Sequence, residues 1–485
     1  MLTRLKVSGF KNLVDVDISF GPFTCIAGGN GVGKSNLFDA IRFLSALAEE
    51  KTFREAAMKV RDNNGTPSAI KSLFHRHGTY NDNKMTFEAE MIIPKEGIDD
   101  FGQEFEAGNT FLRYSLELGF NKNINGIGGI ELLKEELAPI EQNEASNHLL
   151  FSHEKSWRDS IIIGDRKSPL ISTEDARIIV HLDSSIHGAP LGKANVTLEA
   201  KVDKLQNTMI STANAAGSFP MRIAKKEMQS WKIFSLEPSA LREPDKFGVP
   251  SHPGENGTNL PSTVYRIATA TKNNESRVYQ EIANRLKDLI DDVSNISVDR
   301  DDKRELMTLE LTDRNGTKYA ARDLSDGTLR FLAAATILAD EQMQGLICFE
   351  EPENGIHPAR IPAMIELLMD IAVDAELPVE EGNPLRQVII NTHSPAVVAQ
   401  VPDDCLLFVE LRETIKDKKR FKASRFSWLS DTWRAKQQPE IRPEDKGTIL
   451  SFLNPVPYED DSGMSGTRVI DREDLQEYLP FYPED

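Results

Sequence analysis

Residues 28–35 read Gly-Gly-Asn-Gly-Val-Gly-Lys-Ser, which is a complete G-x-x-x-x-G-K-S phosphate loop. The loop follows the apolar run 23–27 and precedes a helix-like stretch over 36–48, the strand–loop–helix order that this motif requires. Its glycines let backbone N–H groups converge on an anion, and the start of the helix adds the positive end of its dipole. Lys34 would reach the β- and γ-phosphates of a nucleoside triphosphate, and the Ser35 hydroxyl would bind Mg²⁺. The expected nucleotide contacts are Asn30, Gly31, Gly33, Lys34, Ser35 and Asn36.

The composition is that of a globular protein with more than one compact unit, because the chain has 485 residues and domains run to about 100–200. No run approaches the roughly 20 apolar residues of a membrane span, and residues 1–6 lack the apolar block of a signal peptide. A cytoplasmic location is therefore expected. The net charge of −19 argues against a general attraction to nucleic acid, although local basic patches stay open. Cys25, Cys348 and Cys405 lie in apolar runs without a C-x-x-C pair, which indicates buried thiols rather than a zinc or redox site.

Hydrophobic patterning divides the chain into four parts. Alternating residues and the phosphate loop define a first lobe over 1–95. Residues 96–235 are looser, with frequent Gly, Asn and charged residues, and are expected to form an inserted α+β arm or lid. Regular patterning returns over 236–411. Residues 412–485 hold a basic, aromatic segment and then an acidic tail.

Local patterns predict three further elements. Apolar positions at spacings of three and four predict an amphipathic helix over 278–293 and a short one over 202–210. Asn315-Gly316 lies between the apolar runs 306–311 and 317–320, and this arrangement predicts a β-hairpin.

A second candidate motif is Leu-Ser-Asp-Gly-Thr at 324–328, which begins an Ala-rich stretch. Taken alone, this motif is typical of a helix N-cap, in which Ser325 or Asp326 accepts hydrogen bonds from the first free N–H groups.

Two apolar runs then end in side chains with catalytic potential. The run 346–349 ends in Glu350 and Glu351, of which one can hold Mg²⁺ through water while the other orients and deprotonates an attacking water. A solvated acidic turn is the ordinary alternative. The run 388–392 delivers His393 at its carboxyl end, where ligands collect in α/β sheets, although a lone histidine there is more often structural.

The order of these motifs resembles that of the ABC-class ATPases of the SMC, RecF and OLD branch. The resemblance covers about residues 1–95 and 236–410. It implies an α/β fold, an ABC-type ATPase head with a mixed β-sheet and flanking helices into which the arm or lid is inserted. The blocks that carry the resemblance are 7–13, 28–38, 324–328, 350–358 and 391–395.

The resemblance assigns a role to each motif of the head. Ser35 and Glu350 would hold Mg²⁺, Glu351 would be the catalytic base that hydrolyses ATP, and His393 would contact the γ-phosphate. Glu350 stands where the family usually has Asp, and its additional methylene moves the carboxylate, so slow turnover is expected.

The motif at 324–328 resembles the signature loop of this class. In this class Ser325 and Gly327 would touch the γ-phosphate that the opposite protomer binds. The resemblance therefore implies a homodimer that closes head to head around ATP, with higher oligomers left open. Asp326 stands where transporter-type signatures have Gly, a difference that this branch tolerates.

The general layout is similar to the stand-alone ATPase subunits of bacterial anti-phage defence systems of the Septu and PARIS types. Each of these works with a partner nuclease. No nuclease motif follows His393 in the sequence: Glu410 ends an apolar run, but the Asp-x-Asp pair of a Toprim domain does not succeed it. The expected function is an ATP-hydrolysing subunit that controls a separately encoded nuclease.

A RecF-like, DNA-binding repair ATPase is the alternative. Residues 412–436 hold nine basic side chains against three acidic ones, with interleaved aromatics that suit contacts to the backbone and bases of DNA or RNA. A solvated hairpin whose aromatics face the core explains the same pattern. The basic residues are Arg412, Lys416, Lys418, Lys419, Arg420, Lys422, Arg425, Arg434 and Lys436.

The acidic tail over 455–485 carries nine acids and two arginines among aromatic residues. Such a tail would dock a partner, pack on its own head or remain disordered.

Overall fold

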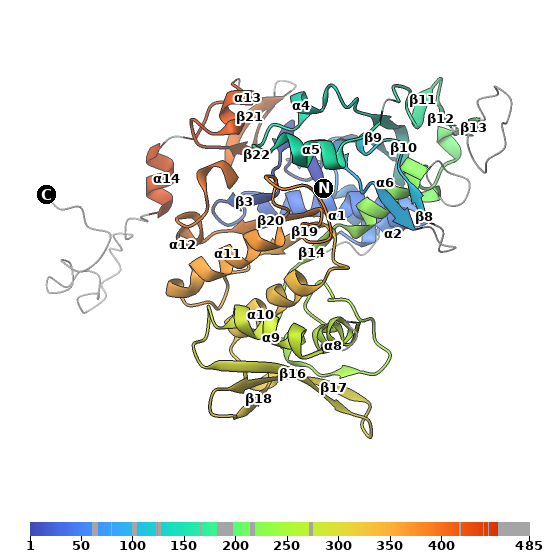
Figure 1. Cartoon of the computed structure of the whole chain (residues 1–485). Helices are drawn as coiled ribbons and strands as arrows, with labels where there is room; N and C mark the ends of the chain where they lie inside the picture. The colour runs from blue at the N-terminus through green and yellow to red at the C-terminus, as the bar shows by residue number, and fades with distance from the viewer. Residues whose placement is uncertain are drawn as a thin grey trace, which may run out of the picture.

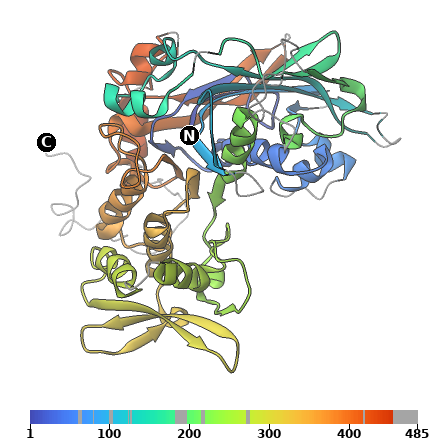
Figure 2. The same cartoon turned by 45° about the vertical axis from the view of Figure 1, so that its right-hand side comes forward.

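The computed structural model describes the chain over residues 1–60, 66–78, 80–98, 104–122, 124, 128–164, 166–181, 197–213, 219–270, 275–416, 419–439, 441–444 and 446–453. Figure 1 shows sheets and helices layered in the upper part of the molecule and a helical lobe with its own small sheet below them. Figure 2 shows that this small sheet forms the bottom of the lobe, with the helices between it and the upper part.

The central sheet has six strands in the order β14-β19-β20-β3-β21-β22. The first five run parallel, and β22 returns antiparallel to β21. The strands β3 and β19 are mostly apolar, β20 has an apolar centre, and all three are almost wholly buried, as expected for parallel strands covered on both faces. The bounds are β3 (Phe23–Ala27), β14 (Lys232–Phe234), β19 (Gly345–Glu350), β20 (Arg386–Thr392), β21 (Leu406–Lys416) and β22 (Lys419–Ser427).

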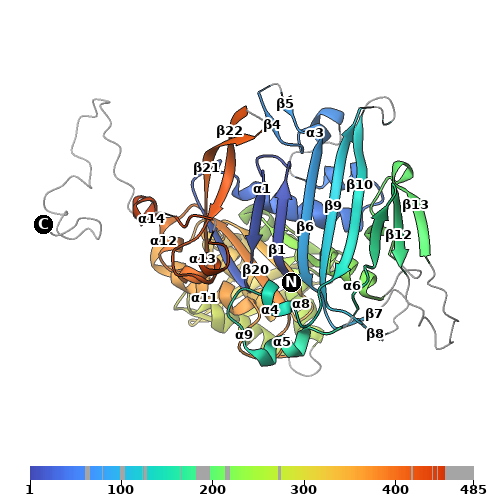
Figure 3. The same cartoon turned by 90° about the horizontal axis from the view of Figure 1, so that it is seen from above.

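A second sheet is antiparallel and has eight strands in the order β13-β12-β11-β10-β9-β6-β1-β2. Helix α1 (Lys34–Glu49) shares one buried core with this sheet and with the central sheet (Figure 3). The bounds are β1 (Leu2–Ser8), β2 (Val16–Ser19), β6 (Lys84–Ile92), β9 (Phe111–Asn121), β10 (Gly129–Pro139), β11 (Ile171–Glu174), β12 (Arg177–His181) and β13 (Thr197–Lys201).

Strand pairing in this sheet differs from the expectation of a separate arm over 96–235. β9 pairs with β6 along its length, and β10 pairs with β9, so both strands belong to the same sheet as β1 and β2. The physical reason is the alternation of buried and exposed side chains along β9 and β10, which fits a sheet with one face on the core. The described part of this segment therefore extends the first lobe, and the chain returns to the central sheet at β14.

The prediction of a helix over 202–210 is wrong. This stretch contains a 3₁₀ turn over Val202–Lys204, and a second turn follows over Ile210–Thr212. The backbone N–H groups of Met209 and Ile210 donate to the Glu135 carboxylate at 2.6 and 2.9 Å, instead of to carbonyls one helical turn back. A side chain on β10 therefore decides the conformation of this segment.

Glu135 makes the stability of this sheet dependent on pH. Burial raises its pKa to about 7 from an ordinary value of 4.5, and the hydrogen bonds from Met209, Ile210 and Tyr114 offset only part of that rise. The folded chain therefore holds a proton that the unfolded chain releases, so the stabilisation is complete below pH 4.5 and is lost as pH rises through about 7. We expect the free energy of unfolding to fall by about 3 kcal/mol over this window.

Urea unfolding of the wild type and of Glu135→Gln across the same pH range measures this effect. Glutamine has a similar shape and cannot ionise, so the variant should lack this decline. Parallel pH profiles for the two proteins would contradict the assignment of the buried proton to Glu135.

The lower lobe comprises residues 238–339 and contains the predicted hairpin. The prediction is confirmed, since β17 and β18 pair antiparallel with Leu311 opposite Tyr319. The predicted helix over 278–293 is present but ends at Leu286, because Val293 begins a strand of the small sheet. The bounds are α7 (Pro238–Arg242), β15 (Asp245–Lys246), α8 (Leu260–Ala270), α9 (Glu275–Leu286), β16 (Val293–Asp301), β17 (Leu306–Asp313), β18 (Lys318–Ala320) and α10 (Asp326–Ala339).

The expected boundary between residues 411 and 412 falls inside β21, so the basic segment continues the central sheet. Residues 454–485, and with them the acidic tail, lie outside the described residues. No helix within the described ranges has the length and apolar character to cross a membrane. The remaining elements are α2 (Phe53–Met58), α3 (Pro67–Lys71), β4 (Arg76–His77), β5 (Tyr80–Asn81), β7 (Glu96–Ile98), β8 (Glu104–Glu106), α4 (Ala145–His148), α5 (Lys155–Ile161), α6 (Phe219–Ser230), α11 (Ile361–Ile371), α12 (Pro395–Val398), α13 (Trp433–Gln437) and α14 (Lys446–Leu453).

Candidate active site

Three neighbouring parallel strands bring the predicted catalytic motifs to one edge of the central sheet. Glu350 at the end of β19 is in register with Asn391 on β20, and Thr392 is in register with Ala27 on β3. The loop after β3 is the phosphate loop, the loop after β19 begins with Glu351, and the loop after β20 begins with His393. Ligands of open α/β sheets bind at such carboxyl ends.

The phosphate loop has the backbone that its glycines allow. Gly31 and Gly33 have φ values of 75° and 110°, a region that side chains disfavour. The Lys34 ammonium donates to the carbonyls of Gly28 and Gly29, both at 2.7 Å. Burial lowers the pKa of Lys34, while the charges of Glu351 and Glu353 oppose that shift. The lysine therefore lies within the field of both acids.

Glu351 occupies the centre of a small polar network. It is a non-glycine residue with φ of 45°, and its N–H donates to the main-chain and side-chain oxygens of Asn391, both at 3.1 Å. His393 Nδ1 lies 2.8 Å from Glu351 Oε1, and Asn354 Nδ2 donates to Oε2 at 2.9 Å. Two adjacent loops thus hold this carboxylate from both sides.

The network keeps Glu351 ionised at neutral pH. Burial alone would raise its pKa, but the hydrogen bonds from Asn354 and His393 and the charges of His393 and Lys34 lower it below its ordinary value. Each carboxylate oxygen retains a further lone pair, so the group can still accept a proton from water. The geometry suits a general base.

Glu353 is a buried acid that sequence reasoning did not assign to the site. Its side chain accepts a hydrogen bond from the Thr392 hydroxyl, and its other oxygen is buried without a hydrogen-bond partner. Burial raises its pKa above the ordinary value. Thr392 Oγ1 also accepts from the N–H of Ser394 at 2.9 Å, so this pair anchors the loop that presents His393.

The donors at this edge fit a nucleotide with Mg²⁺. Residues 29–31 of the phosphate loop are exposed while Gly33 and Lys34 behind them are buried, so an anion can reach the loop from solvent. Ser35 at the start of α1 and Glu350 at the end of β19 offer a hydroxyl and a carboxylate, the hard oxygen ligands that Mg²⁺ prefers. When bound, the ion would neutralise charge on the phosphates.

The 324–328 motif forms the start of α10, as its N-cap pattern predicts. Ser325 Oγ accepts from the N–H of Thr328 at 3.2 Å, and Asp326 pairs with Arg242 at 2.5 Å. A Cβ atom on Gly327 would lie 2.5 Å from the carbonyl oxygen of Gly355, so only glycine fits there.

Helix α10 contacts the loop after β19, and this contact links the lower lobe to the catalytic network. The Arg330 guanidinium donates to the carbonyl of Asn354, whose side chain holds Glu351. The contacts of Ser325 and Gly327 within the described chain are to their own helix and to this loop, and none is to the phosphate loop. Ser325 and Asp326 are exposed.

Three aromatic side chains of the basic segment pack within the fold. Phe421 packs against the rings of His75 and His77 at centroid distances of 4.8 and 5.0 Å. Phe426 and Trp428 are buried in the core. This arrangement favours the reading of the segment as a hairpin whose aromatics face inward. Lys418 lies outside the described residues.

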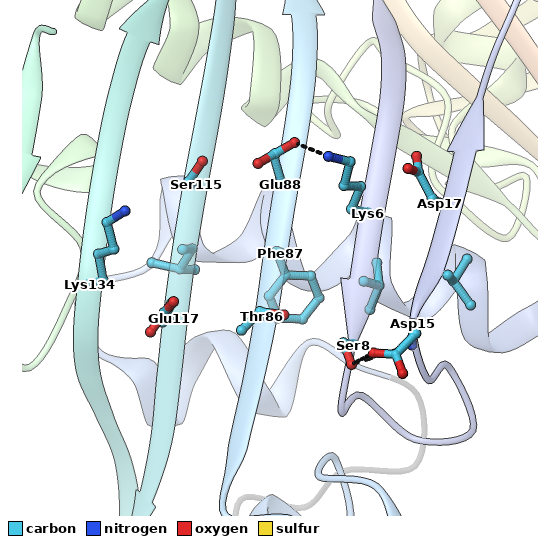
Figure 4. Close-up of a pocket in the computed structure, with 13 residues that line it drawn as sticks. Lys6, Ser8, Asp15, Asp17, Thr86, Phe87, Glu88, Ser115, Glu117 and Lys134 are labelled. Carbon is cyan, nitrogen blue, oxygen red and sulfur yellow. Dashed lines mark hydrogen bonds and ion pairs between the residues drawn. The ribbon is translucent and has the colours of Figure 1, made fainter. Parts of the chain in front are cut away.

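A hollow of about 410 Å³ lies on the open face of the eight-stranded sheet (Figure 4). Its lining differs in chemistry from the edge of the central sheet that holds the phosphate loop. Its polar lining is paired across strands, with Lys6 bonded to Glu88 at 2.9 Å and Ser8 to Asp15 at 2.7 Å. The lining holds two lysines against four acids, so it offers no concentrated positive charge for a phosphate. The strand-end edge is therefore the candidate site.

Two family models match the chain on either side of its middle. Residues 4–144 match a model described as an AAA domain, and residues 226–399 match one described as an AAA domain, putative AbiEii toxin, Type IV TA system. These ranges contain the phosphate loop and the Glu351–His393 network. Both ranges are therefore similar to AAA domains.

Two curated proteins match a short part of the chain. The chain is 34% identical over 58 residues to the DNA replication and repair protein RecF of Paenarthrobacter aurescens (strain TC1), covering 12% of this chain and 14% of that protein. It is 44% identical over 46 residues to the RecF of Parabacteroides distasonis, covering 9% and 13%. The aligned part thus spans about one seventh of the length of these curated relatives.

Solved SMC heads are similar to this chain at low sequence identity. An SMC head bound to the C-winged helix domain of ScpA has a TM-score of 0.45 and 14% identity, covering 87% of this chain and 98% of that one. The SMC head domain from Thermotoga maritima has a TM-score of 0.37 and 11% identity, covering 88% and 99%.

Proposed function

We propose that the chain is the ATP-hydrolysing subunit of a bacterial anti-phage defence system, in which two copies dimerise head to head around ATP and control a separately encoded nuclease. Lys34 and the phosphate loop would bind ATP, Ser35 and Glu350 would hold Mg²⁺, and Glu351 would deprotonate the attacking water with His393 beside it.

The observation that carries this proposal is the division of the site between two surfaces. The catalytic network lies at the edge of the central sheet, while the exposed helix start at Ser325 lies on the lower lobe. A helix amino terminus with free N–H groups is a second anion site, which the ATP of another copy would occupy. The Arg330–Asn354 contact would then connect the binding of the other copy's ATP at α10 to the chain's own Glu351.

The match to a model described as a putative AbiEii toxin of a Type IV TA system supports a role in defence rather than in transport. Co-purification of the chain with a nuclease encoded by the adjacent gene would test this part of the proposal directly.

ATP-dependent dimerisation is the central test. We expect Glu351→Gln with ATP and Mg²⁺ to change in light-scattering mass from 54.2 kDa to twice that value. The additional substitution Ser325→Arg should abolish this change while ATP binding persists, because it blocks the helix start. Thr52→Arg is the matched control, since Thr52 caps α2 through Glu55 N–H at 3.1 Å. A monomer at saturating ATP, or a dimer that tolerates Ser325→Arg, would sink the proposal.

A RecF-like DNA-binding ATPase is the second candidate, and the two short matches to RecF proteins favour it. The burial of Phe426 and Trp428 on and after β22 makes base stacking by these two rings less favourable than backbone contacts by basic side chains. A salt-dependent affinity for DNA that falls on neutralising Arg420 and Lys422 would favour this candidate over the first.

A further inference from the structure

The hairpin β21–β22 lies outside the motifs of the head. It nevertheless lies against both ends of the phosphate loop, with Val409 near Gly28 and Ser424 at Val32. Ser424 on β22 donates its hydroxyl proton to the carbonyl of Val32 at 2.6 Å. The N–H of Ser424 donates to the carbonyl of Asn12 at 3.1 Å. Figure 3 shows the hairpin next to the edge of the eight-stranded sheet, where β2 lies. Ser424 is 4% exposed.

We propose that Ser424 is a positioning residue for the phosphate loop, and that the hairpin β21–β22 thereby sets the affinity of the chain for nucleotide phosphates. The inference rests on the proposed nucleotide binding at residues 28–35. It concerns a residue that is far in sequence from every motif of that site.

The argument from geometry begins with the peptide unit between Val32 and Gly33. In a planar trans peptide the C=O and the N–H point in opposite directions. Ser424 holds the Val32 carbonyl on the side of the hairpin, so the Gly33 N–H points to the opposite side. That side is where a phosphate loop cradles its anion with backbone N–H groups.

The loop is tightly enclosed on the hairpin side. A Cβ atom built on Gly33 would lie 2.1 Å from Ser424 Oγ and 2.6 Å from Asn12 Nδ2, and one on Gly28 would lie 2.3 Å from the Val409 carbonyl oxygen. On the other side, a Cβ atom on Gly31 would meet no atom within 4 Å. The loop is therefore closely packed at Gly28 and Gly33 and unobstructed at Gly31.

Asn12 extends this support to the start of α1. Its side-chain oxygen accepts from Asn36 Nδ2 at 2.6 Å, while its main-chain carbonyl accepts from Ser424. Ser424 and Asn12 therefore hold the two ends of the segment 32–36 in one arrangement. A preorganised loop binds phosphate more tightly because less conformational freedom is lost on binding.

A neighbouring serine on the same strand provides a matched control. Ser427 is also buried and donates a hydrogen bond, but its partner is Glu444 Oε2 at 2.6 Å. Removing the Ser424 hydroxyl deletes its bond to Val32, whereas removing the Ser427 hydroxyl deletes its bonds to Glu444 and, at 3.4 Å, to the Phe408 carbonyl. Only Ser424→Ala deletes a contact to the phosphate loop.

The experiment measures the Kd for Mg–ATP and Mg–ADP by calorimetry, and the melting temperature, for wild type, Ser424→Ala and Ser427→Ala. We expect Ser424→Ala to raise the Kd values of both nucleotides by the same factor of about three to ten, since the loop would cradle phosphates that both nucleotides have. Ser427→Ala should lower the melting temperature to a similar extent and leave both Kd values unchanged. If Ser424→Ala does not fold, Ser424→Cys serves instead, because a thiol has a similar size and is a weak donor.

A folded Ser424 variant with wild-type Kd values would overturn the inference, and so would an equal loss of affinity in Ser427→Ala. Lys34→Ala distinguishes this failure from a failure of the proposed function. If the wild type binds ATP and Lys34→Ala does not, the nucleotide site stands whatever Ser424 does. If the wild type itself binds no nucleotide, the proposed function falls and the inference falls with it.

Discussion

Replacing Glu351 by glutamine should leave ATP binding intact and slow hydrolysis by about 10² to 10⁴-fold, the range that a general base contributes. The amide has the shape of the carboxylate and can keep contacts with His393 and Asn354, which hold Glu351 from both sides. It cannot accept the proton that an attacking water must lose. Single-turnover hydrolysis and a separate Kd for ATP measure the two effects independently.

Glu353→Gln is the control for this prediction. Glu353 lies in the same loop, but it is buried and accepts a hydrogen bond from the Thr392 hydroxyl, which a glutamine oxygen can also accept, so the glutamine should change hydrolysis far less. The two substitutions lie in one loop and are expected to have very different effects on the rate of ATP hydrolysis. Wild-type hydrolysis by Glu351→Gln, or a larger loss in Glu353→Gln, would show that the base is assigned to the wrong residue.

Replacing Lys34 by alanine should weaken ATP binding by at least about 100-fold, because in the proposed site the ammonium would make charge-assisted hydrogen bonds to two phosphates. In the structure its donors are directed to the carbonyls of Gly28 and Gly29, so the lysine is already held at the loop. Arg42→Ala is the control, since this cation lies on the same helix and pairs with Glu255 at 2.9 Å. Calorimetry with Mg–ATP that gives equal affinity for wild type and Lys34→Ala would place the nucleotide elsewhere.

The local elements of the head were predictable because they depend on neighbouring residues. The apolar runs that became β3, β19 and β20 are continuous in sequence, and the hairpin around Asn315-Gly316 depends on turn chemistry alone. The segment 96–235 was not predictable in this way. β9 and β10 join the sheet by pairing with β6, and no local pattern states which strand a given strand will choose.

The short turns near residue 210 show the same limit within one segment. Apolar residues at helical spacing indicated a helix there, yet Met209 and Ile210 give their N–H groups to Glu135, 74 and 75 positions earlier. A tertiary hydrogen bond to a buried carboxylate outweighs a weak local preference.

The sequence by itself determined which chemistry is present: a glycine-rich loop with Lys34 and Ser35, an acid pair after one apolar strand, a histidine after another, and a serine at a helix start. Each is a local property, set by residue type and by the strand or helix beside it. Only the tertiary structure decided how they meet. The parallel register of β19 and β20 places His393 against Glu351, and the return of β22 brings Ser424 to Val32 across 392 positions. Such contacts depend on which strands pair, and that choice is made by burial of the whole core rather than by any single stretch of the chain.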